Sequence, residues 1–160
     1  MPMNAMKNNI FFQLVNQHHG NAFFPSDEMA VMWIQHGLVH TYPEIAITLA
    51  LVDMHDMTTL NINFREKVGP TNVLTFLDDD AEQNLHGDIV ICPAVLQQEA
   101  TEQDISEKAH FAHLFIHGLL HLQGYDHIEE AEAVVMEDLE QQILANILPT
   151  LQKNQRPKEI

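Results

Sequence analysis

Residues 45–52, with the sequence IAITLALV, form a nearly continuous apolar run that has the length of one β-strand. A run this short and this apolar is typical of a strand in the interior of a sheet. The chain has 160 residues, of which 46% are hydrophobic, so it can bury a core of ordinary domain size. We therefore predict a central strand here, within one domain over residues 1–149 that is followed by a flexible tail over 150–160.

Three further strands and five helices are predicted around this strand. Runs rich in β-branched and aromatic residues indicate strands at 10–15, 71–76 and 87–92. Helical spacing and end signals predict helices over 27–41, from Asp53 or Asp56 to about 64, and over 93–103, 107–123 and 129–148. This order predicts an α+β fold, a mixed β-sheet of about four strands packed with helices, rather than a purely parallel doubly wound sheet.

Local signals also mark where the helices begin and end. Ser26 and Ser106 each precede a helical pattern and are predicted N-caps. Gly124 follows the fourth helix at the position where a left-handed residue ends a helix. The last helix is predicted to turn a row of acids toward solvent, namely Glu129, Glu130, Glu132, Glu137, Asp138 and Glu140.

Charge and cysteine content exclude several classes of protein. With 7 Lys+Arg against 23 Asp+Glu, the net charge of −16 excludes a protein that neutralises nucleic-acid phosphates over its whole surface, and we expect no DNA partner. The one cysteine, Cys92, excludes an internal disulfide framework and fits a reducing compartment. No apolar run approaches the roughly 20 residues that span a bilayer, and no signal peptide is recognisable. We expect a cytoplasmic protein without a membrane partner.

The 11 histidines are the most informative part of the composition. His117 and His121 are four residues apart, so both imidazoles lie on one face of the predicted helix. Gly124 ends the helix, and the returning chain brings His127 toward them. Three neutral imidazoles in this arrangement suit Zn²⁺ and leave a position open for water or substrate. Histidines on a helix are often plain surface residues, but the third histidine and the glycine together favour a metal centre.

Residues beside these histidines are expected to support them. His110 and His113 lie one and two turns upstream on the same helix face, and we expect them either to be exposed or to hold the metal ligands in place. We also expect Asp126 or a backbone carbonyl to orient one ligand through its outer ring nitrogen. In metallopeptidases with an H-E-x-x-H motif, a Glu follows the first histidine as general base. That position is Gly118 here.

These motifs together resemble one known family. HGLLHLQGYDH at 117–127 looks like the signature of the YbeY family of bacterial endoribonucleases. NINFR at 61–65, TNVLTF at 71–76 and GDIVI at 87–91 resemble further motifs of that family, in the same order. The resemblance continues through Glu132, Met136 and Glu140, and covers residues 45 to 145.

The resemblance implies a zincin-like metal helix in a single-strand-specific, metal-dependent endoribonuclease. Such enzymes act in 16S rRNA 3′-end maturation and ribosome quality control, in the cytoplasm. It implies one Zn²⁺ per chain on His117, His121 and His127, and a functional arginine at Arg65. The implied partners are single-stranded RNA from the 16S rRNA 3′ region, and the ribosome or its small-subunit proteins.

The chain departs from the family pattern at three positions. Asn72 and Thr75 stand where the family usually has Asp and Ser, and His86 stands where an apolar residue is commoner. The substitution at residue 72 removes a possible negative charge. We interpret His86 as a surface variation.

Residue chemistry also supports phosphodiester hydrolysis. Zn²⁺ lowers the pKa of bound water to about 7, which supplies a nucleophile without a glutamate base. Negative charge that develops on phosphoryl oxygens can be met by a guanidinium, and Arg65 is the only arginine outside the chain ends. The catalytic candidates are therefore Arg65, His117 and His121. Taken alone, Arg65-Glu66-Lys67 would be a solvated loop with a local ion pair.

Two other functions stay open at this point. A metallopeptidase could bind an extended peptide along residues 87–92 if they form an edge strand, although Gly118 argues against it. A non-enzymatic ribosome-assembly factor could carry a structural zinc, whose fourth ligand would be His110 or His113, because structural sites are usually closed by four protein ligands.

Overall fold

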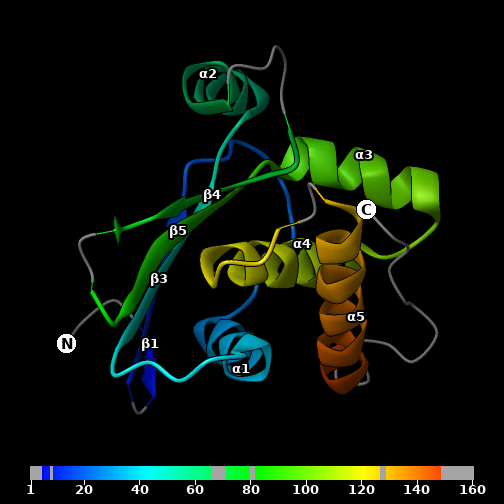
Figure 1. Cartoon of the computed structure of the whole chain (residues 1–160). Coiled ribbons are helices and arrows are strands. Elements are labelled where there is room, and N and C mark those ends of the chain that lie inside the picture. Colours follow the sequence, from blue (N-terminus) through cyan, green and yellow to red (C-terminus); the bar gives the residue numbers. More distant parts are fainter. Residues whose placement is uncertain (1–4, 8, 66–70, 80–81, 127–128, 149–160) are drawn as a thin grey trace.

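The computed structural model describes residues 5–7, 9–65, 71–79, 82–126 and 129–148 (Figure 1). The strands are β1 (Ala5–Lys7), β2 (Ile10–Asn16), β3 (Ile45–Leu51), β4 (Val73–Leu77) and β5 (Leu85–Ile91). The helices are α1 (Asp27–Gly37), α2 (Met54–Arg65), α3 (Pro93–Gln103), α4 (Glu107–Leu122) and α5 (Glu130–Ile147). All five predicted helices and all four predicted strands are present, with shifts at their ends.

The strands form one mixed sheet in the order β1-β2-β3-β5-β4. Strands β2, β3 and β5 are parallel, whereas β1 and β4 pair antiparallel with their neighbours. The predicted α+β class with a mixed sheet is confirmed, and β3 is the middle strand, as its apolar sequence indicates. The short strand β1 was not predicted. Strand β5 lies between β3 and β4, so the expectation that residues 87–92 could form an edge strand is wrong.

The two faces of the sheet differ in how they are covered. Along β3, Ile45, Ile47, Leu49 and Leu51 are buried in the main core with residues of α1 and α4. Figure 1 shows α1, α4 and α5 together on one side of the sheet. The alternate residues of β3 are half-buried, and α2 packs near them through a smaller cluster centred on Met57. The sheet therefore presents its fully apolar face to the helix that carries the histidine motif.

The helix ends follow the predicted signals, with one exception. Ser26 accepts a hydrogen bond from the backbone N–H of Met29 (3.1 Å), and Ser106 accepts one from Ala109 (3.0 Å), as N-caps do. Helix α1 ends at Gly37, four residues before the predicted end. A side chain at residue 37 would meet Leu119 at 2.6 Å, so the glycine allows α1 to approach α4 closely.

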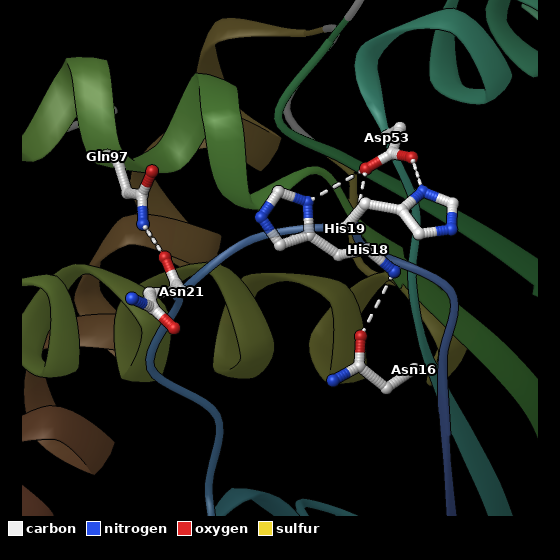
Figure 2. Close-up of polar contacts among 6 residues, drawn as sticks. All are labelled: Asn16, His18, His19, Asn21, Asp53 and Gln97. Carbon is white, nitrogen blue, oxygen red and sulfur yellow. Dashed lines mark hydrogen bonds and ion pairs between the residues drawn. The ribbon is translucent and has the colours of Figure 1, made fainter.

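A second group of histidines ties together the segments that follow β2 and β3 (Figure 2). The Asp53 carboxylate lies 3.0 Å from Nδ1 of His18 and 2.6 Å from Nδ1 of His19, and it also accepts the backbone N–H of His19 at 3.0 Å. These hydrogen bonds from His19 are the main reason that the pKa of Asp53 is lowered. The contacts join the loop before α1 to the start of α2.

Among the residues that the structure describes, no helix is both long enough and apolar enough to cross a membrane.

Candidate metal centre

Helix α4 is a core helix that exposes only two of its later residues. The rings of Phe111 and Phe115 on this helix pack against the ring of Trp33 on α1. Their centroids lie 6.3 Å and 5.7 Å from the Trp33 centroid, respectively. From Ala109 to Leu122 every residue is buried except His117 and His121, which are half-buried. The rings of these two histidines lie 4.8 Å apart, at 77° to each other. The structure therefore brings together two of the three predicted ligands, at the only half-buried positions between Ala109 and Leu122.

The residue after His117 lies on the side of α4 that faces the sheet. A Cβ atom on Gly118 would meet Thr75 of β4 at 3.1 Å and Ile89 of β5 at 3.2 Å. A glutamate at this position would have to push these side chains aside, because even its Cβ atom would be in tight contact with them. The absence of the peptidase glutamate thus has a packing reason, and Thr75 is part of that packing.

Glu140 of α5 is the carboxylate that contacts the histidine strip, and the prediction that it faces solvent is wrong. The residue is only 3% exposed. His117 donates a hydrogen bond from Nδ1 to Oε2 of Glu140, and Nε2 of His113 lies 3.6 Å from Oε1. Because a carboxylate only accepts, this contact holds neutral His117 in the tautomer whose lone pair is on Nε2. That geometry is what a histidine ligand needs.

The charge of Glu140 is stabilised by its neighbours. Burial on its own raises the pKa of Glu140, but the adjacent imidazoles of His113 and His117 outweigh burial and lower this pKa to about 2. The carboxylate therefore stays ionised at all ordinary pH values. It places a full negative charge directly behind His117, which makes the imidazole a stronger donor to a cation.

His110 and His113 are both fully buried, so the expectation that they could be exposed is wrong. His113 stands beside Glu140, whereas His110 lies 2.9 Å from Oε1 of Glu99 on α3. Asn72 donates from Nδ2 to the same carboxylate, at 3.1 Å. Burial raises the pKa of Glu99, and the hydrogen bonds from His110 and Asn72 more than offset this and lower it.

Asn72 therefore has a clear role in a position where a carboxylate was expected from the resemblance. An amide at residue 72 can donate to Glu99, whereas a second carboxylate would repel it. His86, another of the three departures, contacts a carboxylate oxygen of Glu44 at 2.7 Å.

The chain leaves α4 through a Schellman motif. Tyr125 donates its backbone N–H to Leu120 (3.1 Å), and Gly124 donates to His121 (3.0 Å). Gly124 has a φ of 98°, which residues with a side chain rarely adopt. The predicted helix stop is thus confirmed. Asp126 is half-buried just beyond it, and its predicted role as an orienting residue stays a prediction; the described carboxylate on His117 belongs to Glu140.

The remaining predicted site residues are His127 and Arg65. His127 lies outside the described residues. Arg65 is the last residue of α2 rather than part of a loop, and its side chain also lies outside the description. Within the described residues, no three His, Cys, Asp or Glu side chains gather into a metal-binding group.

The two described histidines fit a zinc ion by their chemistry. Imidazole nitrogen is a preferred Zn²⁺ ligand, and a carboxylate on the outer nitrogen is the usual support for such a ligand. Both features are present at His117, and His121 lies beside it.

Comparison with known proteins gives the family. The sequence profile described as Endoribonuclease YbeY matches residues 27–148. The chain belongs to the YbeY family. A protein of Methylococcus capsulatus named Endoribonuclease YbeY is 41% identical over 137 residues, which cover 84% of this chain and 90% of that protein. The solution structure of TM1509 from Thermotoga maritima has the same fold, with a TM-score of 0.60, 22% identity and coverage of 89% of this chain and 93% of that one. Family membership confirms the resemblance seen in the motifs.

Glu140 is a residue of the site whose burial was not predicted from the sequence. Its position in the sequence carried a signal: Met136, Ile143, Leu144 and Ile147 are the buried residues of α5, and Glu140 falls in the same helical row. An acidic residue in an apolar row is either unpaired, which is costly, or paired with a buried group.

Proposed function

We propose that this chain is a single-strand-specific, zinc-dependent endoribonuclease that acts in 16S rRNA 3′-end maturation and ribosome quality control. The family and the relative named Endoribonuclease YbeY support the endoribonuclease role. We further propose one Zn²⁺ per chain, a cytoplasmic location, and partners on the ribosomal small subunit.

One observation carries the proposal for the metal. Between Ala109 and Leu122, only His117 and His121 are accessible to solvent. The buried, ionised carboxylate of Glu140 accepts a hydrogen bond from His117. A carboxylate that accepts from the outer ring nitrogen is the usual support of a metal-binding histidine, because it leaves the other nitrogen free to bind the metal. A cation on the other side of the imidazole gives that carboxylate a reason to be there.

The residues take the following roles in this proposal. His117, His121 and His127 would hold the metal, and Glu140 would fix the ring of His117. When bound, Zn²⁺ supplies Lewis acidity and lowers the pKa of water. Arg65 would bind the phosphate through its guanidinium fork, which stabilises negative charge on the phosphoryl oxygens during cleavage.

Two observations weigh against the other functions. A metallopeptidase of the H-E-x-x-H type needs a base at residue 118, but this position is a glycine packed closely against Thr75 and Ile89. Strand β5 is an interior strand. A closed structural zinc needs a fourth ligand, but His110 is fully buried and directed to Glu99, while His113 is fully buried beside Glu140.

The test is a cleavage assay with the zinc-loaded full chain. We expect it to cut single-stranded RNA, and to leave duplex RNA and casein intact. His121→Ala should lose the RNA cleavage, and His127→Ala should lose most of the zinc by elemental analysis, because two imidazoles bind Zn²⁺ far less well than three. Casein hydrolysis, or cleavage that persists in His121→Ala, would overturn the proposal. Stoichiometric zinc in His127→Ala would overturn the ligand set.

A further inference from the structure

Three aromatic rings gather next to the end of α4. His40 and Tyr42 come from the segment between α1 and β3, and Tyr125 follows Gly124. The His40 ring is stacked parallel to the Tyr125 ring, with 6° between the planes and 5.9 Å between the centroids. The Tyr42 ring stands at 86° to His40, at 6.4 Å. Residues 85 positions apart in the chain thus form one aromatic surface.

The backbone beneath these rings is held in place by side-chain amides. Gln123, which is 9% exposed, accepts the N–H of Val39 (2.8 Å) and of His40 (3.3 Å) on Oε1. It donates from Nε2 to the carbonyl of Gly37 at 2.8 Å. On the other side, Asn9 donates to the carbonyl of Tyr42 at 2.7 Å. These bonds fix the position of His40 before any ligand arrives.

The two stacked rings differ in their surroundings. Tyr125 and Tyr42 are half-buried and pack against the main core, whereas His40 is exposed. The pair therefore has one ring anchored in the protein and one ring that solvent reaches. An exposed aromatic ring held on a rigid backbone is the form that protein platforms for unpaired bases take.

The His40–Tyr125 pair, here called the platform, lies beside the end of the helix that carries His117 and His121. Tyr125 donates its backbone N–H to Leu120, and Gly124 donates to His121, so Tyr125 lies within one helical turn of His121. The backbone that carries one ring of the pair therefore follows directly from the end of the helix that carries both histidines.

We propose that the His40–Tyr125 pair is a stacking site for one unpaired nucleobase of the RNA strand that the histidine site cleaves. This inference rests on the proposed function and adds to it a way to hold the substrate. A chain with a net charge of −16 cannot draw its affinity for RNA from general phosphate neutralisation. Stacking on an aromatic ring needs no positive charge, and it requires the base to be unpaired.

The alternative is that the rings only pack the loop against α4. The two ideas differ in one measurable respect. A stacking site contacts one base of the strand, so its removal should matter only when that base is present. A packing contact would show no dependence on any particular base.

The test measures binding of fluorescent single-stranded RNA with cleavage-resistant phosphorothioate linkages by the zinc-loaded full chain, so that the metal site can hold one phosphate and fix the register of the strand. A set of oligonucleotides carries one abasic site at successive positions. We expect one position at which the abasic site weakens binding by the wild type about tenfold, the usual scale for a stacked base. We expect His40→Ala to bind the intact strand about tenfold less well, and to be insensitive to the abasic site at that position.

Two further variants sharpen this result. His36→Ala removes another exposed histidine, in the last turn of α1, and should bind as the wild type does. His40→Tyr keeps a ring and should restore binding. Because stacking releases no counterions, His40→Ala should leave the salt dependence of binding unchanged.

The outcomes separate the platform from the proposed function. Equal binding by His40→Ala and wild type, or a loss that His40→Tyr does not restore, overturns the platform, even if the zinc-loaded chain cleaves RNA normally. Position-specific binding that depends on His40, in a chain that never cleaves RNA when loaded with zinc, supports the platform and overturns the endoribonuclease.

Discussion

Replacing Glu140 by glutamine removes one charge from the candidate metal centre and changes almost nothing else in shape. The amide oxygen can still accept the Nδ1–H of His117, so the ring keeps a neutral hydrogen bond. What disappears is the negative charge between His113 and His117. Glu140→Gln therefore separates the electrostatic role of this residue from its packing role.

The size of the effect follows from the pKa of Glu140. Burial alone would raise this pKa, but the neighbouring imidazoles lower it from 4.5 to about 2. At about 1.4 kcal/mol per pH unit, the folded chain favours the carboxylate by about 3 kcal/mol. Because the glutamine keeps part of the hydrogen bond, we expect the free energy of unfolding of the metal-free chain to fall by about 1–3 kcal/mol at pH 7.

The same shift fixes the sign of the pH dependence. A carboxyl group whose pKa is lowered on folding contributes its full stability above its ordinary pKa of 4.5, and loses it as the pH falls toward 2. The difference in unfolding free energy between wild type and Glu140→Gln should thus narrow as the pH falls from about 4.5 toward 2.

Metal binding gives an independent measurement. Loss of a group that orients a histidine ligand typically weakens metal affinity about 10–100-fold, and we expect Glu140→Gln to lose Zn²⁺ affinity on this scale in a chelator competition. Glu137→Gln is the matched control, because Glu137 is exposed one turn earlier on α5. If Glu140→Gln matches Glu137→Gln in both stability and zinc affinity, the role assigned to Glu140 is refuted.

Three other substitutions test separate parts of the site. Gly118→Glu should lower the unfolding free energy by about 1–3 kcal/mol, because the side chain meets Thr75 and Ile89, and it should confer no casein hydrolysis. Gly118→Ala should cost less in the same denaturation experiment. Asn72→Asp should destabilise the chain at pH 7 by about 1 kcal/mol, because it places a second carboxylate against Glu99. In urea titrations this loss of stability should shrink as the pH falls toward 4. A loss that does not change with pH would contradict the repulsion between the two carboxylates. Arg65→Lys should impair RNA cleavage nearly as much as Arg65→Ala, about 10²–10³-fold at equal zinc occupancy, because a lysine cannot form a bidentate fork. Cleavage at the wild-type rate in Arg65→Ala would remove this residue from the mechanism.

Features fixed by local chemistry could be predicted from the sequence. Ser26, Ser106 and Gly124 bond or turn as their neighbours in the chain dictate, and the apolar run at 45–52 could only be an interior strand. The end of α1 could not be predicted, because the backbone N–H groups of residues 39 and 40 bind Gln123, which follows α4 and is more than 80 positions away in the chain.

The difference between local and long-range contacts also explains which residues of the site could be predicted. His117 and His121 follow from their spacing on one helix. Glu140 reaches them from another helix, and its charge made it resemble the exposed acids around it. Its pairing with His117 depends on how α5 packs against α4, which spacing within either helix does not determine.

The contact between Glu140 and His117 also links metal binding to the packing of α5. The carboxylate lies on α5 and the ligand lies on α4, so a cation held by His117 strengthens a bond between the two helices. A ligand that binds only the folded chain stabilises it in proportion to the logarithm of its concentration over its Kd.

In this chain the added stability should be concentrated where α5 meets α4. Hydrogen exchange of the amides around Met136 and Leu144 should therefore slow when zinc is added. Glu140→Gln should lose that protection even at zinc concentrations that saturate the site, because the charged bond between the helices is gone. Protection that persists in the saturated variant would mean that the metal acts on α4 alone.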